Sequence, residues 1–420
     1  MDSSQPSRQS ADATVDSLRR YVDASPSPYH AVIEGASRLD EAGFTDGDAG
    51  TGVTVDGGML FAWRRGRPDG ARIIVAHTDS PNLRIKPHPD RTSFGIHQIA
   101  TEPYGGALVA SWLDRDLGVS GRVTVRSDNG AGYETLLFRA DEALLRLPQL
   151  AIHLDREVNE RGLVVDRQRH LNALWALERD GGPEFADWLA DRLATTRDRI
   201  VAWDLMCHDV TPASLSGRDG GLLASGRLDN LVSCWGAVEA LCTIDGEFGD
   251  PANHPTVVVA LFDHEEVGSE SATGAASPRL GRLLDQLEVD RTTALVLSAD
   301  MAHGCHPNHA DRHEPGHPVV LGGGPAIKTN VNQRYATDAR SAAAVDAACR
   351  SAGLNPQTYV HRADMACGST VGPMTASRLG IATADVGLPM LAMHSARETM
   401  ATADVPAAVG LFAEWLRGRR

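Results

Sequence analysis

The sequence predicts an α/β protein in which helices flank a mixed sheet and a mostly β region is inserted into the chain. Two runs, 72–76, which is apolar after Arg72, and 257–262, have the length and the β-branched content of buried strands. Alternating strand-like segments replace this pattern in the middle of the chain. We therefore expect a split α/β domain, 1–88 and 226–420, interrupted by an insertion at 89–225.

The expected elements follow in order along the chain. A helix from Val15 ends at the break Ser25-Pro26-Ser27-Pro28, and a second helix ends at Gly43. After the strand at 72–76, the insertion is expected to contain a strand at 121–126, a hairpin turn at Asp128-Asn129-Gly130 and an amphipathic helix at 185–193. Alternating helices and strands then follow, with a helix from Asp229 and strands at 257–262, 292–298 and 381–393.

Composition and charge argue against several classes of partner. Hydrophobic residues at 42% and charged residues at 23% are ordinary globular values, and no segment has the roughly 18 consecutive apolar residues of a membrane helix. The formal net charge of -15 argues against nucleic acid or an anionic membrane. The six cysteines lack C-x-x-C spacing and the N-terminus lacks the apolar core of a signal peptide, so we expect a cytoplasmic protein with free thiols.

Potential metal ligands stand where the expected strands end, and one opens a helix. Each alone has a structural explanation as a helix cap or a loop residue. The carboxyl ends of parallel strands meet at one edge of a sheet, so these side chains are expected to converge. Two histidines and three carboxylates suit a pair of zinc-like ions with Asp229 as a bridge. The expected ligands are His77, Asp229, Glu266, Asp300 and His394.

Glu265, next to one expected ligand, remains as the candidate general base. Beside a metal-bound water it can take a proton and later deliver it to a leaving amine, which predicts a hydrolase. Asp79 stands two residues after His77 and can orient that imidazole, as metal-bound histidines usually require.

Nine segments of the chain, taken in order, resemble the motifs of the aspartyl aminopeptidase family, which belongs to the dinuclear zinc exopeptidases. The resemblance extends from the SPSPYHA segment near Ser25 almost to the C-terminus. Ser111 and Leu113 stand where relatives often carry Thr and Phe. The segments are HTDSPNLRIKP (77–87), YGGALVASWLDRDL (104–117), LAIHLDR (150–156), GRLDN (226–230), DHEEVGSESATGA (263–275), SADMAHGCHPN (298–308), GPAIKTNVNQRYATD (324–338), CGSTVGP (367–373) and MHSARE (393–398).

The resemblance implies a zinc-exopeptidase-like fold with two Zn²⁺ per subunit. It further implies release of N-terminal Asp, then Glu, from peptides by attack of a metal hydroxide with Glu265 as the base. His77 and Asp300 would hold one zinc, Glu266 and His394 would hold the other, and Asp229 would bridge them. The implied substrate-binding residues are His153, Glu265, Asp300, His303, Lys328 and Tyr335. His153 would reach the site of a neighbouring subunit, in a homododecamer assembled through the insertion.

Lysine usage singles out Lys328. Of the 40 lysine and arginine residues, only Lys86 and Lys328 are lysines. A position that keeps lysine in this background can require a compact ammonium rather than a planar guanidinium. An enzyme that selects acidic N-terminal residues must offer a cation to the substrate carboxylate, and Lys328 fits that need. For Lys86 we expect only a structural role.

Several alternatives remain open at this point. The same ligands accept Co²⁺ or Mn²⁺. A dinuclear aminopeptidase that prefers neutral N-terminal residues and a non-catalytic shell or cargo-binding protein are the competing functions. The glycines 322–324 lack the G-K-[ST] sequel of a phosphate loop. A local histidine cluster is expected to form a polar loop rather than another metal site: His306, His309, His313 and His317.

Overall fold

The computed structural model describes residues 8–44, 50–127, 132–177 and 182–418. The chain divides into two compact units. The first comprises Met1–Asp79, Ala213–Met393 and Glu398–Arg420, and the second comprises Ser80–Pro212 and His394–Arg397. The domain boundaries expected from the sequence stay a prediction, and the hairpin turn expected at 128–130 lies outside the described residues.

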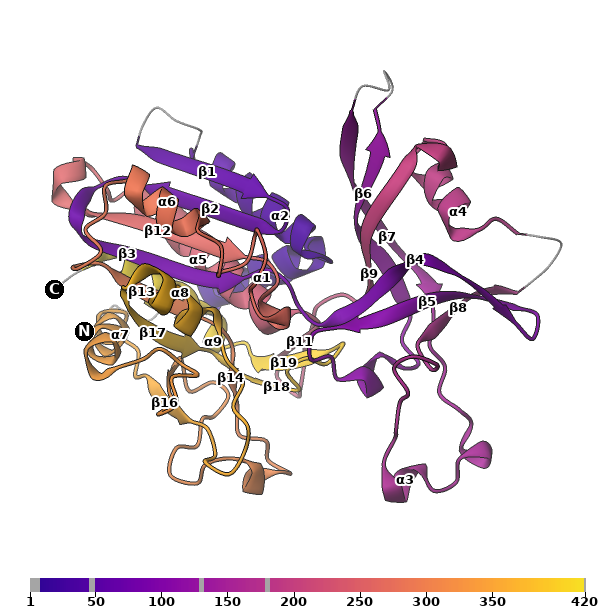
Figure 1. Cartoon of the computed structure of the whole chain (residues 1–420). Helices are drawn as coiled ribbons and strands as arrows, with labels where there is room; N and C mark the ends of the chain where they lie inside the picture. Colours follow the sequence, from indigo (N-terminus) through magenta and orange to yellow (C-terminus); the bar gives the residue numbers. More distant parts are fainter. Residues whose placement is uncertain (1–7, 45–49, 128–131, 178–181, 419–420) are drawn as a thin grey trace. The chain divides into compact units, whose positions relative to one another are not determined.

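The first unit is built around a mixed sheet, which confirms the predicted fold class (Figure 1). Its strand order is β1-β2-β12-β3-β13-β17-β15-β16. Neighbours from β12 to β17 run parallel, whereas β1, β2 and β15 are antiparallel to adjacent strands. The strands are β1 (Thr51–Asp56), β2 (Met59–Arg64), β3 (Arg67–His77), β12 (Pro255–Phe262), β13 (Leu295–Ala299), β15 (Ala326–Thr329), β16 (Gln357–Val360) and β17 (Ala382–Gly387).

The run at 257–262 is apolar throughout because β12 is buried on both faces. Val257, Val259 and Leu261 pack into one hydrophobic cluster. Val258 and Phe262 pack into another cluster on the opposite face. Alternate side chains of a strand point to opposite faces, so a sheet covered by helices on both sides requires a continuous apolar run.

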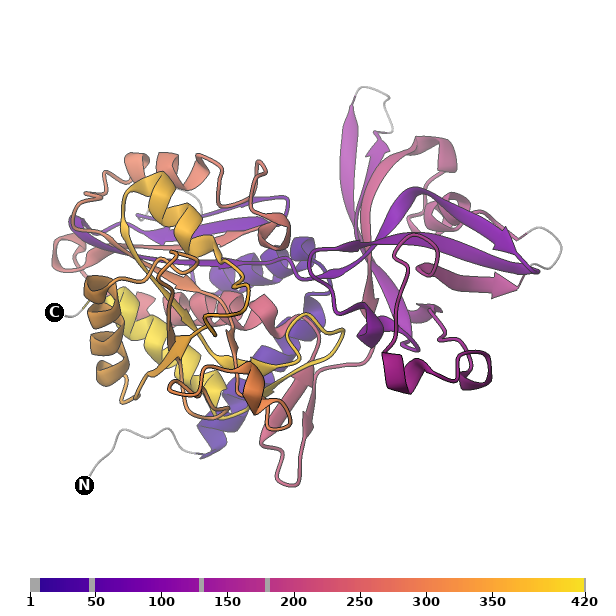
Figure 2. The same ribbon diagram turned by 60° about the horizontal axis from the view of Figure 1, so that its bottom comes forward.

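Helices cover this sheet, and α7 and α9 lie side by side in the rotated view (Figure 2). Trp235 of α5 is fully buried in the larger hydrophobic cluster. None of the described helices is long and apolar enough to cross a membrane. The helices of this unit are α1 (Arg8–Ala24), α2 (Pro28–Glu41), α5 (Leu228–Asp245), α6 (Arg279–Gln286), α7 (Ala339–Ser351), α8 (Val371–Leu379) and α9 (Asp404–Arg417).

A smaller sheet in the same unit has the order β10-β11-β19-β18-β14. It explains why the strand expected at 381–393 is interrupted, since β17 ends at Gly387 and β18 then joins the smaller sheet. Its strands are β10 (Ser214–Ser216), β11 (Leu222–Ser225), β14 (Ala302–His303), β18 (Pro389–Leu391) and β19 (Glu398–Ala401).

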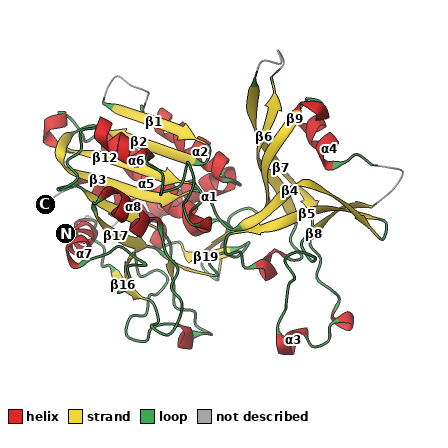
Figure 3. Cartoon of the chain, viewed as in Figure 1, coloured by secondary structure: helices red, strands yellow, loops and turns green. Residues whose placement is uncertain are grey.

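The second unit is mostly β, and its sheet is antiparallel with the order β7-β6-β9-β4-β5-β8 (Figure 3). Its core includes Phe185 of α4, whose ring contacts Trp175, Trp188 and Trp203. The amphipathic helix expected at 185–193 is therefore present and packs by its aromatic face. The elements are β4 (Asn82–Ser93), β5 (Ile96–Tyr104), β6 (Leu117–Arg126), β7 (Tyr133–Leu145), β8 (Asn172–Leu177), β9 (Ile200–Asp209), α3 (Val158–Arg161) and α4 (Phe185–Arg192).

Candidate metal centre

The acidic and histidine side chains of the first unit gather at the carboxyl ends of three neighbouring parallel strands. His77 is the last residue of β3, and Asp300 directly follows β13. Glu265 and Glu266 begin the short 3-10 helix η5 (Glu265–Val267), which follows β12. Because β12 and β13 are the two neighbours of β3, their ends meet at one edge of the sheet.

His77, Asp229 and Asp300 form a buried cluster whose donor atoms all lie within 4.8 Å of one another. His77 Nε2 is 3.5 Å from Asp229 Oδ1 and 3.7 Å from Asp300 Oδ1. Zinc ligands about 2.0–2.2 Å from a tetrahedral ion are roughly 3.3–3.6 Å apart, so these spacings fit a shared cation. Imidazole and carboxylate are ligands that Zn²⁺, Co²⁺ and Mn²⁺ accept.

The imidazole of His77 is held so that Nε2 is available as a ligand. Its Nδ1–H donates to the carbonyl oxygen of Asp79 at 3.0 Å. The thiol of Cys234 donates to the His77 carbonyl at 2.9 Å. This second contact ties the end of β3 to helix α5, and the first fixes the tautomer that a metal at Nε2 requires.

The Asp79 carboxylate holds the segment that carries the two glutamates. Its oxygens accept the backbone N–H groups of Glu265 and Glu266 at 3.0 and 3.1 Å. Asp79 is fully buried, and its Oδ1 is also 3.4 Å from Nδ1 of His77. The sequence suggested only that Asp79 orients His77, whereas the structure gives its carboxylate a further role in positioning the glutamates.

Asp229 is positioned by contacts of its own segment. Helix α5 has its N-cap at Arg227, and Asp229 and Asn230 have non-helical backbone angles, so Asp229 does not act as an ordinary cap. Its backbone N–H donates to Oε2 of the buried Glu398 at 3.1 Å. The Asn230 amide donates to the Ala299 carbonyl at 2.8 Å, which joins this segment to β13.

The surroundings of Glu265 and His77 shift the pKa values of both side chains. Burial raises the pKa of Glu265 to about 8, with His77 opposing and nearby Asp300, Asp79 and Asp229 adding to the rise. Burial opposes charge on His77, but the surrounding Asp229, Asp300 and Asp79 outweigh it and raise the pKa of the imidazole well above its usual value. Such shifts are typical of functional sites.

His394 belongs to the second unit and is positioned there by the segment 104–117. Its Nδ1–H donates to the Gly106 carbonyl at 3.2 Å, and its own carbonyl accepts the Leu108 N–H at 2.9 Å. Ser111 Oγ accepts the Ala396 N–H at 2.8 Å, so the serine hydroxyl also joins this segment to the His394 loop. As in His77, Nδ1 is engaged by a carbonyl, which fits a metal ligand acting through Nε2.

Lys328 is almost completely buried, with 2% of its surface exposed, which is rare for a lysine. Its Nζ donates to the carbonyls of Asp300 and Met301 at 2.9 and 3.1 Å. The ammonium also lies 5.1 Å from the ring centroid of Tyr335. Lys328 of β15 therefore lies against the backbone of one expected ligand, Asp300, and its ammonium is the expected substrate-binding cation.

A cavity of about 760 Å³ lies beside the segment that joins Lys328 to Tyr335. His361 lines it, and this ring is hydrogen-bonded through Nδ1 to the Tyr359 hydroxyl at 2.7 Å. The ring of His303, an exposed residue, is 6.0 Å from that of Tyr359. The lining is mixed: its polar side chains include Asn330, Asn332, Gln333, Arg334, Thr337 and Arg362, and its apolar ones include Val331, Val360 and Met365.

His153 belongs to the second unit, whereas His77, Asp229 and Asp300 belong to the first. His153 is exposed in the 3-10 helix η2 (Ile152–Leu154). Leu150, Ile152 and Leu154 around it are also exposed, at 64%, 46% and 74%. Exposed apolar side chains close together are common at interaction surfaces.

The glycines 322–324, the histidine-rich loop and Lys86, for which the sequence indicated no catalytic role, have structural surroundings of their own. The amides of Gly322 and Gly324 donate to the buried Asp404 carboxylate at 2.7 and 2.9 Å, so a protein anion fills the place of a phosphate. In the histidine-rich loop, His313 Nε2 accepts the His306 N–H at 3.0 Å. Lys86 is partly buried in β4.

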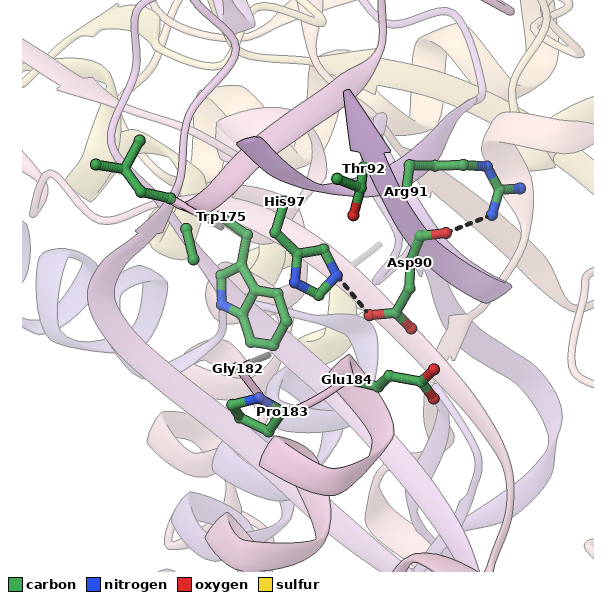
Figure 4. Close-up of a pocket in the computed structure, with 10 residues that line it drawn as sticks. Asp90, Arg91, Thr92, His97, Trp175, Gly182, Pro183 and Glu184 are labelled. Atoms are coloured by element: carbon green, nitrogen blue, oxygen red, sulfur yellow. Dashed lines mark hydrogen bonds and ion pairs between the residues drawn. The ribbon is translucent and has the colours of Figure 1, made fainter. Parts of the chain in front are cut away.

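A separate pocket of about 310 Å³ lies in the second unit (Figure 4). At its wall, His97 Nε2 is 3.0 Å from Asp90 Oδ1, and the His97 ring meets Trp175 edge to face. Asp90 Oδ1 also accepts the Phe185 N–H at 2.8 Å. The pair therefore anchors the first turn of α4, which is a structural role.

Sequence reasoning missed two buried carboxylates of the first unit. Glu398, which receives the Asp229 N–H, stood in a quoted motif without a role. Asp385 lies in the middle of β17 and is fully buried. A charged residue within an otherwise apolar strand was the available signal, but it does not reveal the partner.

A mixed sheet covered by helices, with a buried imidazole and carboxylate cluster at the carboxyl ends of its parallel strands, has the fold and the donor groups of a metal-dependent enzyme. A family model described as aminopeptidase I zinc metalloprotease (M18) matches residues 21–416. The chain belongs to the M18 family, and the protein is a metallo-aminopeptidase.

Known proteins resemble this chain over nearly its whole length. It is 45% identical over 422 residues to the probable M18 family aminopeptidase 2 of Mycobacterium bovis (strain BCG / Pasteur 1173P2), covering 94% of this chain and 96% of that protein. A chain in the cryo-EM structure of the Ape4 and Nbr1 complex has a TM-score of 0.90 at 32% identity, with 97% and 86% covered. The S. cerevesiae mApe1 dodecamer has a TM-score of 0.84 at 24% identity, with 98% of each chain covered, which shows the fold.

Proposed function

We propose that this metallo-aminopeptidase releases N-terminal acidic residues, Asp before Glu, from peptides and that it uses two Zn²⁺ per subunit. The observation that carries the proposal is the buried ammonium of Lys328, whose Nζ is bound by the carbonyls of Asp300 and Met301. Two carbonyls occupy two of its three N–H donors, which leaves one for a substrate carboxylate. In a chain with net charge -15, only such a local cation can favour an acidic substrate.

The expected ligands divide between two metal positions. His77 and Asp300 would hold one ion, Glu266 and His394 the other, and Asp229 would bridge them. The buried cluster of His77, Asp229 and Asp300 supports the first position. For the second position, the Nδ1–H of His394 is engaged by Gly106, which supports a role for Nε2. Bound zinc would supply Lewis acidity to polarise the substrate carbonyl and to lower the pKa of water.

The residues of the chain then perform the proton transfers and the positioning. Glu265 accepts a proton from the attacking water and delivers it to the leaving amine. Asp79 holds the backbone of Glu265, so the base does not have to be ordered during the reaction. Lys328 and Tyr335 position the acidic side chain, and His303 lines the pocket. Glu265 and Asp300 also contact the substrate near its α-amine.

We further propose that the chain forms a homododecamer in which His153 acts at the site of a neighbouring subunit. Its exposure among exposed Leu150, Ile152 and Leu154 supports a contact with another copy. Mass measurement of the native particle tests the assembly. Mixing His153→Ala chains with Glu265→Gln chains tests the shared site, because sites that combine an intact Glu265 with a neighbour's His153 should regain activity. The six cysteines are free thiols, which supports the cytoplasmic location.

The decisive experiment compares hydrolysis of Asp- and Leu-chromogenic substrates with and without a chelator. We expect faster hydrolysis of the Asp substrate and loss of both activities when metal is removed. Equal rates would favour the alternative with a neutral N-terminal preference. Activity that survives complete metal removal would contradict the metal-dependent mechanism itself.

A further inference from the structure

Asp385 faces Lys328 across two antiparallel strands. The two residues are directly paired in the β15–β17 register, so their side chains project from the same face of the sheet. Asp385 is 0% exposed and Lys328 is 2% exposed. A buried carboxylate and a buried ammonium on one face interact strongly because little water screens them.

Asp385 forms hydrogen bonds with two other segments of the chain, one at 336–337 and one at Thr370. Its Oδ2 accepts the Ala336 N–H at 2.6 Å, and its Oδ1 accepts the Thr370 hydroxyl at 2.5 Å. Its backbone N–H donates to Thr337 Oγ1 at 2.8 Å. The contacts to Ala336 and Thr337 fix the backbone directly after Tyr335, whose ring lies against the Lys328 ammonium.

Asp385 acts on the Lys328 charge without a close ion pair. Among the described residues, the carboxylate within 4.0 Å of Lys328 Nζ is that of Asp300, at 3.6 Å. The Asp385 oxygens are instead occupied by Ala336 and Thr370. Burial raises the pKa of Asp385, while Lys328 and the hydrogen bonds oppose that rise. The carboxylate therefore balances the ammonium without taking the N–H donor that a substrate needs.

The packing around this carboxylate leaves no spare room. A Cβ atom on Gly372 would lie 2.4 Å from Asp385 Oδ2. The Gly372 N–H donates to Thr370 Oγ1 at 3.2 Å, so the threonine hydroxyl keeps its proton for Asp385. Helix α8 begins at this point and thereby locks the carboxylate in one orientation.

We propose that Asp385 is a positioning residue that fixes Lys328 and Tyr335 relative to each other and so sets the preference for acidic N-terminal residues. The inference rests on the proposed function, in which Lys328 binds the carboxylate of the substrate side chain. It adds a specificity residue that touches neither the metals nor the substrate.

The test is Asp385→Asn in the full-length, zinc-loaded enzyme. The amide presents an NH₂ group where the carboxylate accepts two donors, so the backbone after Tyr335 shifts. We expect the KM for the Asp substrate to rise on the order of 10- to 100-fold, because small displacements of a binding group have effects of this size. The KM for the Leu substrate and the zinc content should stay within about twofold of the wild type.

Asp404→Asn is the matched control. Asp404 is also buried and its carboxylate also accepts two loop N–H groups, from Gly322 and Gly324, but it serves a different loop. This variant should leave the ratio of Asp to Leu hydrolysis unchanged. If it lowered the ratio as much as Asp385→Asn does, Asp385 would have a general structural role and the inference would be wrong.

Thr370→Val keeps the inference testable if Asp385→Asn does not fold. It removes one donor to Asp385 and should raise the KM for Asp in the same direction by a smaller factor. An unchanged Asp to Leu ratio in this folded variant would overturn the inference. A wild-type enzyme without an Asp preference would instead refute the proposed function, and the inference with it. A wild-type Asp preference that survives Asp385→Asn refutes the inference alone.

Discussion

Asp79 Oδ1 accepts the backbone N–H of Glu265 at 3.0 Å. A residue just after β3 therefore positions the candidate base, which lies just after the neighbouring strand β12. The other oxygen accepts the N–H of Glu266 at 3.1 Å. Both bonds come from one buried carboxylate, which makes the geometry of the glutamate pair depend on the His77–Asp79 segment. Asp79 thus connects the His77 imidazole to the candidate base, Glu265.

Asp79→Asn should therefore impair catalysis. The asparagine amide can accept only one of the two N–H groups, so the glutamate segment loses a hydrogen bond and its fixed position. We expect kcat to fall about 10- to 100-fold, as for other residues that orient a metal site. Steady-state kinetics together with thermal unfolding check this. Wild-type kcat in a folded Asp79→Asn enzyme would contradict the role.

Glu265→Gln and Glu266→Gln should differ in kind. The first removes the base, so turnover should be abolished while the zinc content stays nearly intact. The second removes a ligand and should weaken one metal position directly. Metal analysis after dialysis, combined with activity, separates the two effects. Equal loss of metal from both variants would show that the assigned division of roles is wrong.

Zinc binding to the chelator-treated protein should release protons near pH 7. The pKa of Glu265, about 8, means that this carboxyl is largely protonated there before metal binds, and the raised pKa of His77 favours the protonated imidazole. A metal requires neutral His77 and favours the Glu265 carboxylate. As pH rises through about 8, Glu265 has already lost its proton, so the release should decline.

Calorimetry of zinc binding in buffers with different ionisation enthalpies measures this release. Glu265→Gln provides the control, because it lacks the titrating group and should release fewer protons at pH 7 than the wild type. An equal release from both proteins would show that Glu265 is already ionised before metal binds.

Lys328→Met should remove the preference for acidic substrates. The methionine keeps most of the side-chain volume but lacks the charged donor, whose hydrogen bond to a carboxylate is worth about 1.5–3 kcal/mol. We expect kcat/KM for the Asp substrate to fall roughly 10- to 150-fold, with a smaller change for Leu. Lys86→Met, at the other lysine of the chain, is the control and should behave like the wild type.

Gly106→Ala should lower the zinc content. A Cβ atom at this position would lie 3.0 Å from His394 Nδ1 and would displace the ring from the Gly106 carbonyl. Gly246→Ala is the control, since its Cβ would meet no heavy atom within 4 Å. Zinc per chain, measured by elemental analysis, should fall in the first variant alone. A fully loaded Gly106→Ala enzyme would argue against His394 as a ligand.

Part of the fold and of the candidate site was predictable because strand ends carry their own signal. The apolar run before Glu265 identified β12, and the run before His77 identified β3. Parallel strands meet at one edge, so the convergence of His77 and Asp300 followed from local patterns. The sequence did not predict that the strand expected at 381–393 is divided after Gly387 into β17 and β18. Pairing of β18 with β19 in the smaller sheet causes this division.

The sequence by itself determined the α/β class, the strand-end side chains and the unusual retention of Lys328. Only the tertiary structure decided which residues position these side chains through hydrogen bonds. Asp79 positions Glu265 across 186 residues, and Asp385 binds Ala336 across 49. Hydrogen bonds between segments so distant have no local periodicity or propensity. A buried carboxylate is therefore visible in the sequence as an anomaly, and its partner becomes known only when the chain is folded.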